Sequence, residues 1–187
     1  SVDLESNRIF KKLQNRNRVG WSMSFDNIGP RVEYVRHGSS WDQIKTNFLT
    51  IKELMKSQGH WGGIHAVYNI YNATRVCELR EFAEETGTSV LWQNLFQPDY
   101  LDPFLHGTIV AQAALEEIDR FYAMNIATPA EHQFFNNARN MYNKVTETTT
   151  HATKKFQAHI NDIETKFHPD TAGMFVELWP ELKELCK

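Results

Sequence analysis

The sequence is poor in cysteine, and its two cysteines, Cys77 and Cys186, lie far apart. They form neither a CxxC pair nor a zinc-type spacing, which favours reduced thiols in a protein of the cytoplasmic type. Long apolar runs are also missing, since no stretch approaches the roughly 20 residues that span a bilayer. A secretory signal pattern is absent as well. We therefore expect a cytoplasmic protein with no membrane partner.

A strong excess of charge of either sign is missing too. The formal net charge is -3 over 187 residues, so no general basic field predicts binding to nucleic acid. The length allows one domain, or one domain with an appendage. Hydrophobic residues make up 41% and aromatic residues 12% of the chain, enough to build a core. The sequence starts at Ser1 and enters a helical pattern directly, which favours a fragment or a processed chain.

Three apolar segments alternate with helical patterns in the first half of the chain. The predicted strands lie near residues 19–25, 61–69 and 88–96. The predicted helices of this half are 3–14, 41–58 and 75–86. Such alternation is typical of βαβ units with a parallel sheet. The pattern after Pro103 is helical, with segments predicted at 108–124, 128–145, 156–167 and 174–185 and a break over the threonine-rich 147–153.

This order predicts an α/β fold with two parts. Residues 1–104 are expected to form half of a TIM-like barrel, with three parallel strands and their helices. Residues 105–187 are expected to form an α-helical C-terminal extension. Three strands do not close a barrel, so the sheet is expected to have two free edges that need a partner.

Polar side chains gather where the first predicted strand ends. Ser22, Ser24 and Asp26 alternate along this strand and so share one face. The loop after the turn signal at residues 27–30 carries Arg36, a cation suited to a carboxylate or a phosphate-sized anion. Parallel α/β folds place ligands at the carboxyl ends of their strands, so we predict a binding site here. In the structural alternative the serines fill space, Asp26 caps the turn and Arg36 is a solvated charge.

The same stretch resembles the fourth strand and the following loop of radical S-adenosylmethionine enzymes. The similarity is carried by the run Ser24-Phe25-Asp26-Asn27, Tyr34-Val35-Arg36-His37-Gly38-Ser39 and Trp41. It is nearest to the sulfatase-maturating and other peptide-modifying branch and to phage-type members. Asn27 stands where the family usually has glycine, and Asn also adopts positive φ. Later segments follow in matching order: Val67-Tyr68-Asn69, Asn94 to Leu101, and Phe156 to Trp179-Pro180-Glu181-Leu182.

The resemblance implies roles for individual residues. In relatives, the positions of Ser24 and Arg36 hold the methionyl carboxylate or the ribose of S-adenosylmethionine. Asn69 is implied as a neighbouring polar contact and Leu101 as an apolar wall against adenine. The alternatives are that Asn69 caps the strand end and that Leu101 packs a loop. The predicted cofactor-binding set is Ser22, Ser24, Asp26, Arg36, Asn69 and Leu101, with no metal ligand among them.

One family feature is missing from the sequence. The CxxxCxxC loop that ligates a [4Fe–4S] cluster in these enzymes has no counterpart here, and neither do the first three strands of the barrel. The resemblance therefore implies the C-terminal half of a radical enzyme, which works only when an N-terminal half brings the cluster. That half would lie in the same polypeptide or in a partner subunit. Hydrogen abstraction from a peptide or another small polar substrate is the implied reaction.

Two other classes of protein remain open. A non-catalytic interaction or scaffold protein derived from such a half would present aromatic residues of the extension, unless these form its core. The residues concerned are Phe134, Phe135, Tyr142 and Trp179. A small zinc or iron protein would draw on histidines that lack tight ligand spacing. These are His60, His65, His132, His151 and His168.

Overall fold

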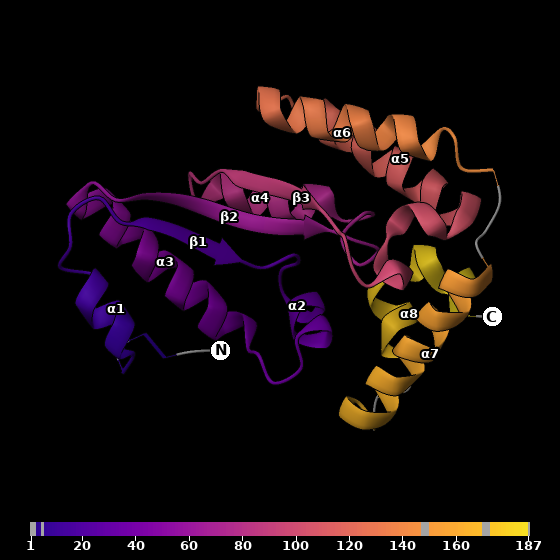
Figure 1. The fold of residues 1–187 in the computed structure, drawn as a ribbon, viewed down its shortest axis with the longest axis horizontal. Helices are drawn as coiled ribbons and strands as arrows, with labels where there is room; N and C mark the ends of the chain where they lie inside the picture. The colour runs from indigo at the N-terminus through magenta and orange to yellow at the C-terminus, as the bar shows by residue number, and fades with distance from the viewer. Residues whose placement is uncertain (1–2, 5, 147–149, 170–172, 187) are drawn as a thin grey trace.

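The centre of the computed structural model, which describes residues 3–4, 6–146, 150–169 and 173–186, is a parallel sheet. Its strands are β1 (Gly20–Ser24), β2 (Trp61–Tyr68) and β3 (Val90–Asn94), with β2 in the middle. Met23 pairs with Ile64, and Ile64 pairs with Val90. The α/β class, the three strands and their parallel direction are confirmed (Figure 1).

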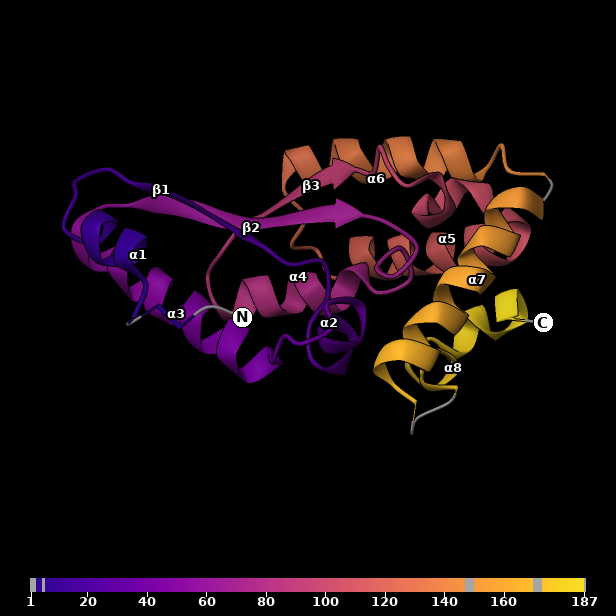
Figure 2. The same ribbon diagram turned by 60° about the horizontal axis from the view of Figure 1, so that its bottom comes forward.

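Two crossover helices cover one face of the sheet. They are α3 (Trp41–Gln58) and α4 (Val76–Glu85), and both lie on the same side of the strands in Figure 2. Phe25 packs edge-on against Phe48 of α3 and Phe82 of α4, with ring centroids 5.8 and 6.1 Å apart. Burial of these rings and of the inward side chains of the strands forms the first core, because it removes a large apolar area from water.

No helix of the described ranges covers the opposite face of β1 and β2 (Figure 2). Ser22 and Ser24 are exposed there, and Leu91 of β3 is 64% exposed. Parallel sheets are normally covered on both faces, because their crossovers place helices on each side. Ser22 and Ser24 share this face of β1 as predicted, whereas Asp26 lies at a bend beyond the end of the strand.

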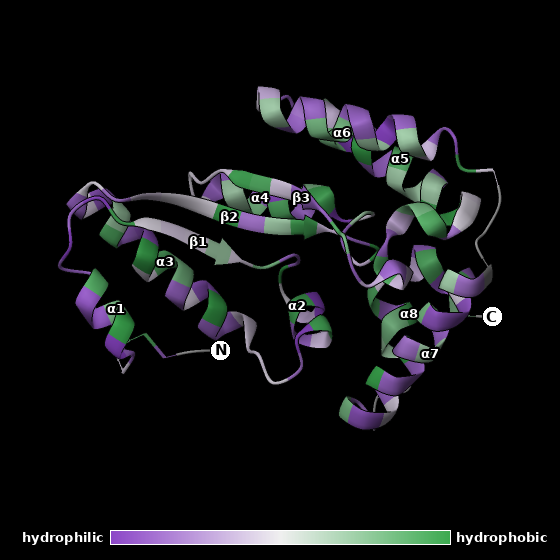
Figure 3. Ribbon diagram, in the orientation of Figure 1, coloured by the Kyte–Doolittle hydropathy of each residue, from purple (hydrophilic) through white to green (hydrophobic). Residues whose placement is uncertain are grey.

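In the described ranges, four α-helices follow the sheet and build the C-terminal extension. They are α5 (Gly107–Ala123), α6 (Pro129–Tyr142), α7 (Thr150–Phe167) and α8 (Met174–Leu178). Hydrophobic and hydrophilic bands alternate along them in Figure 3, as expected for helices that each pack one face on a core. Helices α7 and α8 lie beyond the carboxyl ends of the strands (Figure 1). A second core forms there around Tyr34, Tyr71 and Trp179.

Local sequence signals explain several helix ends. Ser40 accepts a hydrogen bond from the amide of Gln43 at the start of α3, and Gly59 ends that helix in the left-handed conformation. Thr128 and Glu131 form a capping box at the start of α6. Helix α1 (Arg8–Leu13) is shorter than the predicted 3–14, because the Asn7 side chain caps it by accepting from Ile9 and Phe10 amides.

Two sequence interpretations were wrong. The segment after Gly29, expected to be a loop, is a helix, α2 (Pro30–Val35), which Pro30 starts at its first position. The helix break predicted over the threonine-rich residues 147–153 is wrong from Thr150 on, because α7 begins there. Residues 147–149 lie outside the described residues. For the aromatic residues of the extension the core alternative is confirmed: Phe135, Tyr142 and Trp179 are at most 2% exposed, and Phe134 is partly buried.

Candidate functional site

Asp26 extends the hydrogen-bonding of the sheet beyond the end of β1. Its Oδ1 accepts from the backbone N–H of Val67 at 2.7 Å, and its Oδ2 lies 3.3 Å from Nη2 of Arg36. The Arg36 side chain is 41% exposed, so water screens this ion pair and it is weak. Two of the predicted residues are therefore in contact, and Arg36 keeps guanidinium N–H groups available to an anion.

The end of α2 fixes the position of Arg36. The amide of Arg36 donates to the carbonyl of Val32 at 2.9 Å, and its own carbonyl accepts from the amide of Ser39 at 3.0 Å. Glu33 of α2 accepts from the amide of Trp41 at 2.7 Å, which ties α2 to the first residue of α3. The arginine thus projects from a segment with a defined backbone between two helices, at the carboxyl end of the sheet.

Two asparagines shape the end of β2. Asn72 is fully buried; its amide nitrogen donates to the carbonyls of Val67 (2.8 Å) and Asp26 (3.2 Å), and its oxygen accepts from the amide of Asn69 (2.9 Å). The Asn69 side chain donates to Val67 and accepts from the amide of Tyr71, both at 2.9 Å. Both side chains are occupied by backbone groups, which matches the strand-capping alternative for Asn69.

Leu101 belongs to the short 3-10 helix η1 (Asp99–Leu101) in the exit loop of β3. Its carbonyl accepts from the amide of Ile70 at 2.9 Å, directly after Asn69. Its side chain is half-buried against the second core. Leu101 therefore joins the strand-end region through its backbone, and its side chain lies where a loop residue packs.

Ser22 and Ser24 extend the site across the open face of the sheet. In the pairing register Ser24 lies beside His65, which lies beside Leu91. A nitrogen of His65, Nε2, is 2.8 Å from the side-chain oxygen of Gln93, so the row continues as a polar strip onto β3. The structure therefore groups the strand face with Asp26 and Arg36 at one end, where hydroxyl, carboxylate and guanidinium groups can receive a polar ligand.

Neither thiol is poised as a metal ligand or nucleophile. Burial, and next the Glu117 carboxylate, raise the pKa of Cys77 to about 12. Burial and Glu164 also raise the pKa of Cys186. Both remain protonated at neutral pH, and the thiolate is the form that binds metal. Among the described residues no group of three His, Cys, Asp or Glu side chains is arranged to hold a metal ion.

His60, one of the histidines considered for a metal site, has a structural role. Its Nδ1 accepts from Nε1 of Trp21 at 2.9 Å, so its Nε2 carries the proton and donates to the carbonyl of Arg16 at 2.6 Å. Both ring nitrogens are occupied, and the histidine fixes Trp21 against the segment that precedes β1.

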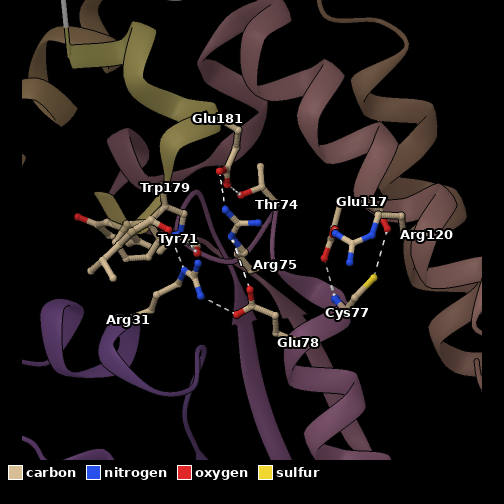
Figure 4. A network of polar contacts seen from close by, with 11 residues as sticks. Arg31, Tyr71, Thr74, Arg75, Cys77, Glu78, Glu117, Arg120, Trp179 and Glu181 are labelled. Atoms are coloured by element: carbon tan, nitrogen blue, oxygen red, sulfur yellow. Dashed lines mark hydrogen bonds and ion pairs between the residues drawn. The ribbon is translucent and has the colours of Figure 1, made fainter. Parts of the chain in front are cut away.

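Sequence reasoning missed a polar network behind the site, drawn in Figure 4. Arg31 of α2 donates to Glu78 of α4 at 2.8 Å, and Arg75 pairs with Glu181 of the C-terminal 3-10 helix η3 (Pro180–Cys186). Thr74 donates to the same Glu181 carboxylate at 2.6 Å. The sequence pointed to this network only through the Pro180-Glu181-Leu182 run. That run does not reveal that Glu181 pairs with Arg75, more than 100 residues away in the chain.

No protein-family model, no curated protein and no solved structure matches this chain. None of the helices in the described ranges combines the length and the apolar character needed to cross a membrane.

Proposed function

We propose that this chain is the C-terminal half of a radical S-adenosylmethionine enzyme and supplies cofactor and substrate contacts to a cluster-bearing N-terminal half. The observation that carries the proposal is the open polar face of the parallel sheet, which ends at the Asp26–Arg36 pair.

A half TIM-like barrel accounts for the one-sided sheet. If further parallel strands pair with the free edge of β1 and curve over the open face, Ser22 and Ser24 point into the barrel. The helices α3 and α4 then form part of its outer ring, on the face where the structure has them. The added strands would cover the open face of the sheet and also pair with the free edge of β1. An unpaired strand edge is an aggregation hazard, which this pairing removes.

S-adenosylmethionine fits the groups at the carboxyl end of the sheet. Its methionyl carboxylate suits the exposed guanidinium of Arg36, since arginine binds carboxylates through two parallel N–H donors. Ser24 offers a hydroxyl to the ribose or the carboxylate on the same side of the sheet. Asp26 orients Arg36 and carries a charge opposite to that of the cofactor's sulfonium. When bound in a complete site, the cofactor supplies the radical that abstracts hydrogen from a substrate.

An iron–sulfur cluster does not fit this chain. Four-iron clusters of this family need three thiolates from one loop, whereas Cys77 is buried in α4 and Cys186 lies in η3. The cluster must therefore come from the proposed N-terminal half. The polar strip of Ser22, Ser24, His65 and Gln93 suits a peptide or another small polar substrate, because it offers both hydrogen-bond donors and acceptors.

The completed pair is expected to cleave S-adenosylmethionine to 5′-deoxyadenosine. The coding sequence beside this chain is first inspected for a CxxxCxxC half, and the two halves are joined or mixed, reconstituted with iron and sulfide without oxygen, and reduced. Chromatography with mass detection measures the product. Each half alone is the control and should give none. A reduced, cluster-loaded pair that forms a complex but makes no 5′-deoxyadenosine contradicts the enzymatic function.

Replacing Arg36 with alanine should weaken S-adenosylmethionine binding to the completed pair by about 10- to 100-fold, since a charged hydrogen bond contributes roughly 1.5–3 kcal/mol. Arg36→Lys keeps the charge but loses the paired donors, so an intermediate loss is expected. Calorimetry measures both, with Arg139→Ala on α6 as the control for loss of an arginine. Unchanged affinity in Arg36→Ala removes this residue from the site.

A binding protein without catalysis is the second candidate. Three large apolar side chains stand on the sheet and its exit loop with high exposure: Trp61 at 59%, Leu91 at 64% and Phe96 at 79%. Such side chains mark contact surfaces when they cluster. This candidate predicts a stable complex with the partner half and no cofactor cleavage, so the assay above separates the two functions.

A further inference from the structure

Helix α2 carries Arg36 at its end and is held by the C-terminal segment of the chain. Nε of Arg31 donates to the carbonyl of Leu178 in α8 at 3.0 Å, while its Nη1 donates to Glu78 at 2.8 Å. The same guanidinium lies over the ring of Trp179, 5.8 Å from its centroid. Arg31 therefore binds α2 to α4 and to the end of α8 at once (Figure 4).

Contacts with the extension recur every third residue along this segment. After Arg31, the ring of Tyr34 is fully buried and packs edge-on against Trp179, with centroids 5.6 Å apart. His37 then stacks on Phe167 at the end of α7, with centroids 4.1 Å apart. Arg31 and Tyr34, three residues apart, lie on one side of α2, so this side of the helix faces the extension. His37 continues these contacts beyond the end of the helix. Arg36 leaves the segment in the other direction, toward Asp26.

The same C-terminal segment is anchored to the turn that ends β2. Nε1 of Trp179 donates to the carbonyl of Tyr71 at 2.8 Å, two residues after Asn69. Glu181 accepts from Thr74 and Arg75 in the next turn of the chain. Trp179 thus touches both walls of the candidate site: the helix that ends at Arg36, and the strand end that Asn69 and Asn72 shape.

We infer that residues 174–186 set the position of Arg36, and that Arg31 is the positioning residue through which they act. Docking of this segment and binding of a carboxylate ligand at Arg36 are then linked, and each strengthens the other. The identity of the ligand rests on the proposed function, but the coupling between the C-terminal segment and α2 does not.

Hydrogen exchange of the chain tests the coupling without any ligand. In Arg31→Met, amides in residues 31–38 and 174–182 should exchange about tenfold faster or more, because the restraint between them is lost, while β2 keeps its protection. Arg139→Met is the matched control, since Arg139 also pairs with a carboxylate (Asp119, 2.6 Å) and lies over a ring (Tyr122, 5.4 Å). That control should leave both segments unchanged.

Partial recovery of protection in Arg31→Lys supports a positioning role, since lysine keeps the charge and can reach one of the two acceptors. Unchanged exchange at 31–38 in Arg31→Met overturns the inference, and so does a rise of equal size throughout β2, which indicates general destabilisation. With S-adenosylmethionine added to the completed pair, wild type should gain protection in both segments and Arg31→Met only in 31–38. Failure of wild type to bind S-adenosylmethionine counts against the proposed function alone, because the ligand-free comparison stands.

Discussion

Replacing Trp179 with alanine is expected to lower the free energy of unfolding by about 3–5 kcal/mol, the usual cost of truncating a large buried aromatic residue. The indole is fully buried in the second core and packs against Tyr34, Tyr71 and Phe175. Its N–H also satisfies the carbonyl of Tyr71, which the truncation leaves without that donor. Urea unfolding followed by circular dichroism measures the change.

Trp61→Ala is the matched control for loss of a tryptophan. Trp61 stands on the open face of β2 and is 59% exposed, so its truncation should cost about 1 kcal/mol or less. Equal losses in the two variants would show that the second core contributes no more than a surface residue, and that the C-terminal segment does not stabilise the fold. At this chain length the expected difference in melting temperature is about 2–4 °C per kcal/mol.

The elements that sequence predicted well are those with local causes. Strand positions follow from short apolar runs bounded by polar turns, and the ends of α3 and α6 follow from Ser40, Gly59 and Thr128. Each of these signals acts within about four residues, so it can be read without knowledge of the tertiary structure. Asp26 belongs to the same group, because its place after an apolar strand already put it at the carboxyl end of the sheet.

The elements that sequence missed depend on distant contacts or on a signal with two meanings. The pair Gly29-Pro30 is typical of a turn, but proline also suits the first position of a helix. Helix α2 is stabilised by the packing of Tyr34 on Trp179, a contact between residues far apart in the sequence. Helix α7 begins at Thr150 despite weak local propensity, since Phe156 and Ile160 bury its inner face. Tertiary burial outweighs propensities of a few tenths of a kcal/mol per residue.

Part of the candidate site was visible in the sequence for the same reason. Ser22 and Ser24 share a face because side chains alternate along a strand, and this periodicity needs no partner. That Arg36 reaches Asp26 follows from the length and path of α2, which the sequence did not reveal. The role of Asn72 was even harder to predict from the sequence, because this side chain joins the ends of β1 and β2 across more than 40 residues of chain.

Replacing Asn72 with aspartate should destabilise the chain by about 3–5 kcal/mol, more than Asn72→Ala. The Asn72 amide donates to the carbonyls of Val67 and Asp26, and a carboxylate would set an oxygen against both in a fully buried place. Alanine only removes three hydrogen bonds, each contributing about 1 kcal/mol. Chemical unfolding at several pH values measures the difference from wild type.

The pH dependence identifies the cause of that loss. A buried carboxyl without a cation has a pKa raised above its unfolded value, so the unfolded chain binds fewer protons over the range between the two pKa values. The penalty of Asn72→Asp should therefore be full above the folded pKa and shrink as the pH falls through it. The control is Asn136→Asp at an exposed position of α6, where the side-chain oxygen accepts from the Tyr122 hydroxyl. This variant should change the free energy of unfolding by no more than about 0.5 kcal/mol at every pH. A loss in Asn72→Asp that does not change with pH would mean that a buried carboxylate facing the two carbonyls is not its cause.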